Sequence, residues 1–238
     1  RYLSLNGTKF PFNDVRMRRA VSLAIDRKNL VHSMYLDYAE PTINILNYTS
    51  PGYKAIPIDY DLQEAKRLAH EVLGEKRCKI TYCINGSEPL QKGEAELIAY
   101  WLQDIGLDVQ IKSIEYATLS RMMRKGDFNI VRIQTGLANG DPFGLLYTFI
   151  MPDGALNISN RLGYNNPEVT ELMSRVKHIT DESERQRVFD RVQEIVAYEQ
   201  PVIPLFNDMN IVAYNKRLKN YKPLIYGVDL SKVELAEE

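Results

Sequence analysis

The chain has 238 residues, of which 45% are hydrophobic and 26% are charged, proportions that are ordinary for a soluble globular protein. Its 30 basic and 31 acidic side chains leave a net charge of −1, so composition gives no electrostatic argument for binding nucleic acid or an anionic membrane. No apolar run approaches the length that spans a bilayer. The chain begins at Arg1 without a signal peptide, and we interpret it as a processed or excised piece of a longer protein.

A strand and two capped helices are the first predicted elements. The strand covers residues 1–6. Within residues 11–27, Asn13 is predicted to cap a helix whose apolar face follows helical spacing. That face comprises Met17, Ala20, Val21 and Ala24. Asp26 is predicted to cap a second, short helix. The expected arrangement is a helical hairpin on a globular domain.

The next stretch, residues 37–60, is predicted to be a long ordered surface loop. It combines three prolines and a glycine with tyrosines and apolar residues, and flexible linkers seldom carry so much hydrophobic mass. Asp61 is expected to cap the following helix, which ends at Gly74.

Strands and helices then alternate along the chain. The predicted strands are residues 79–84, 107–114 and 128–133, and the helices between them begin at Pro89 and Ala117. This alternation favours an α/β domain with crossover helices, in which helices cover a single sheet.

The last third of the chain begins with an irregular stretch, residues 134–163, which is rich in glycine, asparagine and aspartate. Two helices are predicted to begin at Pro167 and Asp181. Two strands are predicted after them, over residues 202–207 and 210–215. Pro204 places the first of these strands at an edge or a bulge.

The sequence offers few residues in patterns typical of catalysis or metal binding. The sequence contains no GxSxG elbow, P-loop or GxGxxG turn, and its three histidines are scattered, so we expect no catalytic site, no metal and no cofactor. Acidic pairs such as Glu94 with Glu96 are expected by chance among 31 acidic residues. Cys78 and Cys83 have an odd spacing within one strand, which points them to opposite faces and argues against a disulfide. Fifteen tyrosines favour either a recognition surface or half-exposed core positions.

Five separated stretches, taken in order, resemble the peptide/nickel-type (family 5) solute-binding proteins of ABC importers. They are residues 11–27, 95–119, 125–133 with 139–142, 163–169 and 184–206. The resemblance implies a single C-terminal lobe of a two-lobed, class II periplasmic-binding-protein-like fold, with a mixed sheet covered by helices. The lobe is predicted to span residues 1–224, and residues 225–238 to form the hinge and the strand that returns to the absent N-terminal lobe.

The resemblance also implies which residues face the ligand. In many peptide binders of this family, the loop after the strand carries a tryptophan and then an aspartate that pairs with the α-ammonium of the peptide. Those positions fall on Thr135 and Ala138, so the usual mode of binding a free peptide N-terminus is not expected. Asn139 and Asp141 are candidates to replace the missing acid, although Asp141 is equally suited to cap the next helix. Arg132 matches an arginine that meets a ligand carboxylate in some peptide binders; the alternative is an ion pair with an acid across the sheet.

The function implied by the resemblance is that of a bacterial extracytoplasmic solute-binding protein, not an enzyme. Such a protein captures oligopeptides between two lobes and delivers them to the permease subunits of an ABC importer. We expect a monomer, in the periplasm or on the cell surface as a lipoprotein. Three alternatives remain: the same fold with a nickel complex, haem or a sugar as ligand, a solute-sensing domain of a DNA-binding regulator, and an enzyme whose site lies within residues 134–163.

Overall fold

The computed structural model describes the whole chain except residues 58, 137–141, 210, 223, 225–228 and 237–238. The chain divides into two compact units, Arg1–Asn207 and Asp208–Glu238. The predicted boundary between residues 224 and 225 falls inside the second unit, and the assignment of residues 225–238 to a returning strand stays a prediction.

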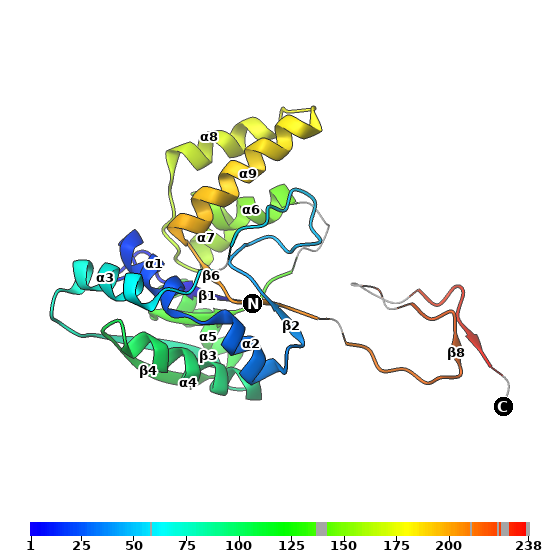
Figure 1. Cartoon of the computed structure of the whole chain (residues 1–238), viewed down its shortest axis with the longest axis horizontal. Coiled ribbons are helices and arrows are strands. Elements are labelled where there is room, and N and C mark those ends of the chain that lie inside the picture. The colour runs from blue at the N-terminus through cyan, green and yellow to red at the C-terminus, as the bar shows by residue number, and fades with distance from the viewer. Residues whose placement is uncertain (58, 137–141, 210, 223, 225–228, 237–238) are drawn as a thin grey trace. The chain divides into compact units, whose positions relative to one another are not determined.

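Five strands of the first unit form one sheet in the order β4-β3-β5-β1-β6 (Figure 1). They are β1 (Tyr2–Leu5), β3 (Cys78–Asn85), β4 (Leu107–Ile114), β5 (Ile130–Ile133) and β6 (Ile203–Pro204). β3 runs parallel to β4 and β5, because two helical crossovers return the chain to the same end of the sheet. β1 is antiparallel to β5 and to β6, so the predicted mixed sheet is confirmed. Pro204 lies in the edge strand, as predicted.

Helices cover both faces of this sheet. One face carries the largest core, which is built by α1 (Val15–Ala24), α2 (Arg27–Tyr35), α3 (Leu62–Leu73) and α4 (Pro89–Gln103). On the other face, α5 (Tyr116–Lys125) packs over Cys83 and Val131. Cys78 packs with the first core and Cys83 with the second, and both thiols are free. The opposite orientation predicted for the two cysteines is confirmed.

Helix caps account for most of the predicted helix starts. The carboxylates of Asp26, Asp61 and Asp181 each accept a hydrogen bond from the backbone N–H three residues later. The cap of α1 is Asp14 and not Asn13, as its Oδ1 accepts from the N–H of Arg16 at 2.8 Å. The predicted helix is therefore correct and its cap is displaced by one residue.

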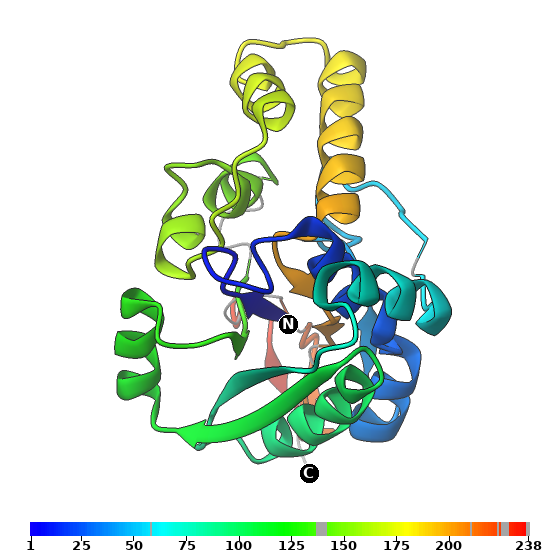
Figure 2. The ribbon, with the colours of Figure 1, turned by 90° about the vertical axis from the view of Figure 1, so that its left-hand side faces the viewer.

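The irregular stretch predicted over residues 134–163 contains two helices, so that prediction is wrong for the described part. They are α6 (Pro142–Ile150) and α7 (Ala155–Ser159). α6 begins at a proline, whose missing N–H suits a first helical turn, and it buries Leu146, Phe149 and Ile150. Those side chains pack in a third core with α8 (Pro167–Val176) and α9 (Glu182–Glu199), which lie side by side (Figure 2). The residues of α6 are helical because their apolar side chains pack in this core, although the composition of the stretch indicated a loop.

The predicted loop over residues 37–60 is ordered around Gln193. The Oε1 atom of Gln193 accepts from the N–H of Lys54 and from Nδ2 of Asn44, both at 3.0 Å, and its Nε2 donates to the carbonyl of Gly52 at 2.7 Å. The loop also contains a short strand, β2 (Ala39–Pro41), which pairs with β7 (Phe206–Asp208). None of the described helices is both long and apolar enough to cross a membrane.

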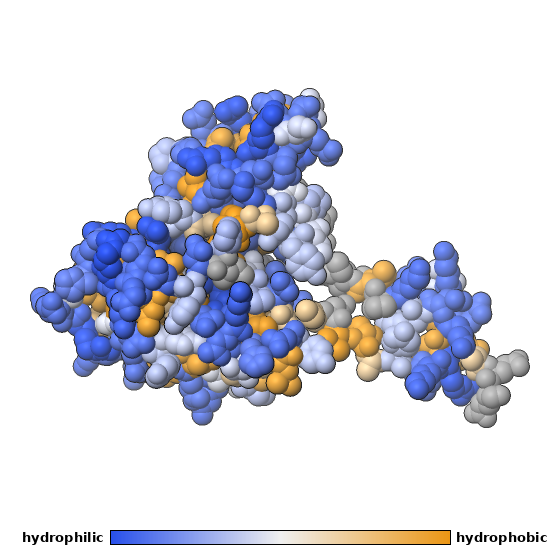
Figure 3. Space-filling view, viewed as in Figure 1, coloured by the Kyte–Doolittle hydropathy of each residue, from blue (hydrophilic) through white to orange (hydrophobic). Residues whose placement is uncertain are grey.

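The second unit is small. Its strands β8 (Leu218–Lys219) and β9 (Glu234–Leu235) pair antiparallel. The strand predicted over residues 210–215 is not observed in 211–215. Hydrophobic side chains at the start of this unit are exposed (Figure 3), among them Ile211 and Val212.

Candidate functional site

The candidate ligand site lies at the sheet edge where β3 and β5 end. β3 ends at Asn85 and β5 at Ile133, and because the two strands are parallel their carboxyl ends lie at the same edge. In open α/β sheets, ligands bind outside the carboxyl ends of the strands. The candidate loop begins directly after β5, and Thr135 is exposed there. Topology therefore brings the predicted loop to the edge where a ligand is expected.

Arg132 lies near the end of β5 and is only 4% exposed. Tyr82 of β3 is the register partner of Ile130, and side chains alternate along a strand, so Tyr82, Ile130 and Arg132 share one face of the sheet. This is the face covered by α4 and α2. The guanidinium consequently points into the helical layer.

A two-contact ion pair joins Arg132 to Glu94 of α4. Nε of Arg132 lies 2.9 Å from Oε2 of Glu94, and Nη2 lies 3.1 Å from Oε1. The two side chains are 2% and 0% exposed. The hydroxyl of Tyr35 also donates to Glu94, and the ring centroid of Phe206 lies 5.9 Å from Cζ of Arg132. Arg132 is in an ion pair, as the predicted alternative has it, but the acid comes from the covering helix α4 and not from across the sheet.

Two polar atoms beside this pair have no partner among the described residues. They are Nη1 of Arg132 and the hydroxyl of Tyr82, and both are buried. Burial raises the pKa of the Tyr82 hydroxyl, and the positive charge of Arg132 partly opposes that shift. Leaving a buried donor unsatisfied costs about 1–3 kcal/mol. The arrangement is therefore prepared for an additional acceptor.

The end of β3 is tied to the start of α4 on the same side. The Oε1 atom of Gln91, a buried residue in the first turn of α4, accepts from the N–H of Asn85 at 2.9 Å. This bond holds the strand end against the helix that carries Glu94. The acid of the ion pair is thus positioned by the β3–α4 connection, while the arginine is positioned by β5.

The structure places two of the five predicted ligand residues. Arg132 is buried in its ion pair, and Thr135 is exposed after the end of β5. Ala138, Asn139 and Asp141 lie outside the described residues. Sequence reasoning missed Glu94, which it treated as a chance acid. A signal was present, because Glu94 falls in helical register with the buried Ile98 and Leu102.

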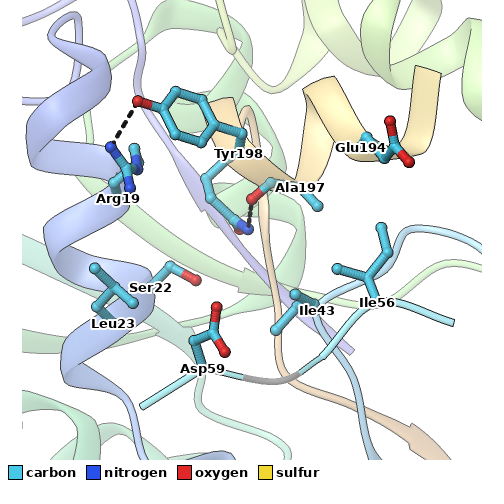
Figure 4. Close-up of a pocket in the computed structure, with 10 residues that line it drawn as sticks. Arg19, Ser22, Leu23, Ile43, Ile56, Asp59, Glu194, Ala197 and Tyr198 are labelled. Atoms are coloured by element: carbon cyan, nitrogen blue, oxygen red, sulfur yellow. Dashed lines mark hydrogen bonds between the residues drawn. The ribbon is translucent and has the colours of Figure 1, made fainter. Parts of the chain in front are cut away.

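A separate pocket of about 240 Å³ lies between α1, α9 and the segment before α3 (Figure 4). Nη1 of Arg19 donates to the hydroxyl of Tyr198 at 2.9 Å on one side, and Ile43 and Ile56 supply apolar surface. The pocket is smaller than the roughly 300–1,000 Å³ of typical ligand pockets. Neither Arg132 nor Thr135, the two predicted ligand residues that the structure describes, lines it. We therefore favour the strand-end site as the candidate.

Clusters of metal-ligating side chains are absent from the described ranges. Those residues hold no group of three or more histidine, cysteine, aspartate or glutamate side chains that could bind a metal ion. The surroundings of Arg132 and Tyr82 are instead suited to hydrogen bonding, because two donors there have no partner among the described residues and lie next to a compensated ion pair.

Comparison with known proteins agrees with the fold. Heme-binding protein A of Haemophilus influenzae is 27% identical over 236 residues, covering 96% of this chain and 43% of that protein. The peptide transport periplasmic protein SapA of the same organism is 25% identical over 244 residues, covering 100% of this chain and 43% of the relative. The structure of the periplasmic binding protein DppA from Helicobacter pylori in complex with the peptide STSA matches with a TM-score of 0.85 and 27% identity, covering 99% of this chain and 47% of that chain.

The chain therefore spans less than half the length of these relatives. The family profile for bacterial extracellular solute-binding proteins, family 5 Middle, matches residues 1–157. The family predicted from five short stretches of sequence is thereby confirmed. This chain belongs to the bacterial extracellular solute-binding proteins of family 5.

Proposed function

We propose that this chain is one lobe, the C-terminal one, of an extracytoplasmic solute-binding protein that captures peptides for an ABC importer. The observation that carries the proposal is the match of nearly the whole chain to DppA, a binding protein whose structure holds a peptide. The candidate site at the strand ends supports it, since a peptide offers the carbonyl and amide groups that such a site can bind.

In the proposed mechanism, two lobes close on the ligand and exclude bulk water. Backbone groups of the protein supply most of the hydrogen bonds to the ligand. Pockets that retain water accommodate ligand side chains of different kinds. The second lobe belongs to the remainder of the protein, and the permease subunits receive the ligand. We further propose a monomer that acts in the periplasm or, as a lipoprotein, at the cell surface.

Thr135, Ala138, Asn139 and Asp141 are proposed to face the ligand from the loop after β5. A buried cation needs a compensating charge, and neither Thr135 nor Ala138 supplies one. Asn139 and Asp141 are the proposed substitutes for binding the ammonium group of a peptide. These roles rest on the resemblance of the loop to the family.

A second candidate is the same fold with a ligand that is not a peptide. Two observations favour it: the neutral residue at Ala138, and the similarity to a protein named for binding haem. An alanine offers no charge to an ammonium group, which suits a ligand that carries none.

Mass spectrometry of ligands that co-purify with the full-length protein separates the two candidates. We expect a heterogeneous mixture of peptides, and recovery of one non-peptide compound in stoichiometric amount would replace the first proposal by the second. Calorimetry on the isolated chain supplies the control. The lobe alone should bind peptides much more weakly than the full-length protein, because it contributes only half of the enclosing surface.

A further inference from the structure

The ion pair between Arg132 and Glu94 changes what this part of the site can recognise. A lone arginine binds a carboxylate through two parallel hydrogen bonds. Here both Nε and Nη2 of Arg132 already donate to the two oxygens of Glu94, at 2.9 and 3.1 Å. The edge of the guanidinium best suited to a ligand carboxylate is therefore occupied by a side chain of the protein.

The charge of the arginine is compensated as well. Both members of the pair are almost completely buried, where charges interact more strongly than in water. A ligand carboxylate placed next to Nη1 would be attracted by Arg132 and repelled by Glu94 at the same time. A neutral acceptor has no such repulsion, and it requires no removal of charge from water on the ligand side.

Two donors nevertheless remain. Nη1 of Arg132 and the hydroxyl of Tyr82 have no acceptor within the part of the chain that the structure describes, and both lie on the face that carries Glu94. Each of them can donate to an uncharged oxygen, which has lone pairs to accept and brings no charge.

We propose that Glu94 is a specificity-determining residue, which neutralises Arg132 so that the site selects a neutral oxygen acceptor of the ligand, such as a peptide carbonyl or an amide, over a terminal carboxylate. The inference rests on the proposed function and narrows its ligand class.

The test compares a short peptide as its free acid and as its C-terminal amide, using calorimetry on the full-length protein. The wild type should bind both forms with similar affinity. Glu94→Gln removes the competing charge and should strengthen binding of the acid over the amide about tenfold, the difference between a charged and a neutral hydrogen bond. Glu96→Gln is the matched control, because Glu96 is exposed on the same helix. It should leave the ratio unchanged.

Tyr82→Phe probes the second donor. It should weaken both forms of the peptide equally, because the hydroxyl is proposed to bind a neutral acceptor in either case. The inference is overturned if the wild type already prefers the free acid more than tenfold and Arg132→Gln abolishes that preference. An unchanged ratio in Glu94→Gln would also overturn it.

A second measurement does not depend on peptide binding. Thermal unfolding is compared in sodium acetate and sodium chloride at equal ionic strength, with acetate as the carboxylate probe. Acetate should stabilise Glu94→Gln specifically, and should not stabilise the wild type or Glu96→Gln. If the wild type binds no peptide but acetate stabilises only Glu94→Gln, the proposed peptide function is wrong and the proposed role of Glu94 is supported. If Glu94→Gln does not fold, the wild type and Arg132→Gln are compared instead. The inference is overturned if acetate specifically raises the thermal unfolding midpoint of the wild type and does not raise that of Arg132→Gln.

Discussion

Arg27 and Arg132 are both buried in the first unit, at 1% and 4% exposure, but their surroundings differ. Around Arg27 all acceptors are uncharged: Nε donates to the carbonyl of Pro204 at 2.7 Å, Nη1 to the carbonyl of Ser22 at 2.9 Å, and Nη2 to Oγ of Ser22 at 2.8 Å. Burial lowers the pKa of Arg27 to about 9. Arg132 has a carboxylate partner, but one of its nitrogens has no acceptor among the described residues.

The difference separates a structural arginine from a candidate ligand contact. Each nitrogen of Arg27 has an acceptor: one bond ties the start of α2 to the edge strand β6, and the other two tie it to Ser22 of α1. The positive charge of Arg132 is compensated by Glu94, but its Nη1 has no hydrogen-bond acceptor among the described residues. Charge and hydrogen bonding have to be accounted for separately, because either can be satisfied without the other.

Substitution of Arg27 is expected to have the largest effect. Arg27→Ala leaves a cavity and buried acceptors without donors, and should lower the free energy of unfolding by about 4 kcal/mol in urea denaturation. Lys28→Ala removes an exposed neighbouring cation and should change stability little. A loss below about 1 kcal/mol for Arg27→Ala would mean that the two arginines do not differ in structural role.

The Arg132 pair should behave differently in a double-mutant cycle. Glu94→Leu alone leaves the buried charge of Arg132 without its partner and should cost about 3 kcal/mol, and Arg132→Met alone should likewise destabilise the protein. Removing both charges in Glu94→Leu with Arg132→Met should recover most of that loss, because a buried ion pair and an apolar pair are often of similar stability. Additive effects of the two substitutions in urea denaturation would contradict the coupling.

The hydroxyls next to the two arginines provide a finer comparison. Ser22→Ala removes the acceptor of Nη2 of Arg27 and should cost about 1–2 kcal/mol. Tyr82→Phe removes a hydroxyl that has no partner among the described residues, and should be close to neutral for stability in the absence of ligand. Thermal unfolding of both variants checks this. A larger loss for Tyr82→Phe would show that its hydroxyl is already satisfied.

An exposed charge gives the smallest expected effect. Backbone hydrogen bonds from Ala117 and Thr118 hold the pKa of Glu115 below its usual 4.5. Because the folded state binds this proton less tightly than the unfolded state, the contribution of Glu115 is present above about pH 4.5 and is lost as the pH falls through the lowered pKa. Glu115→Gln should remove that part of the pH dependence in thermal unfolding. An identical pH profile in the variant would argue against the cap.

Much of the fold could be predicted from local patterns. The helices after Asp61 and Asp181 were predicted at the correct cap, because a carboxylate that binds backbone N–H groups is a local event. The strands β3 and β4 were recognisable from alternation and from the helices around them. α6 was not, because its helix depends on packing against α8.

The candidate site was only partly predictable. The resemblance to the family indicated Arg132 and the loop after β5, and an ion pair was one of the two alternatives. Identification of Glu94 required the contact between β5 and α4, which are separated by 38 positions at this pair. A local pattern does not specify which acid meets a given arginine across that distance.

The sequence by itself indicated the family, through five stretches that resemble it. It also determined the α/β alternation and most helix starts, because caps and periodicity act between neighbouring residues. Tertiary structure decided that β1 runs antiparallel to both β5 and β6, that α6 is a helix, and that Arg132 meets Glu94. These features depend on contacts between distant segments. Their energies come from burial and pairing that exist only after the chain has folded.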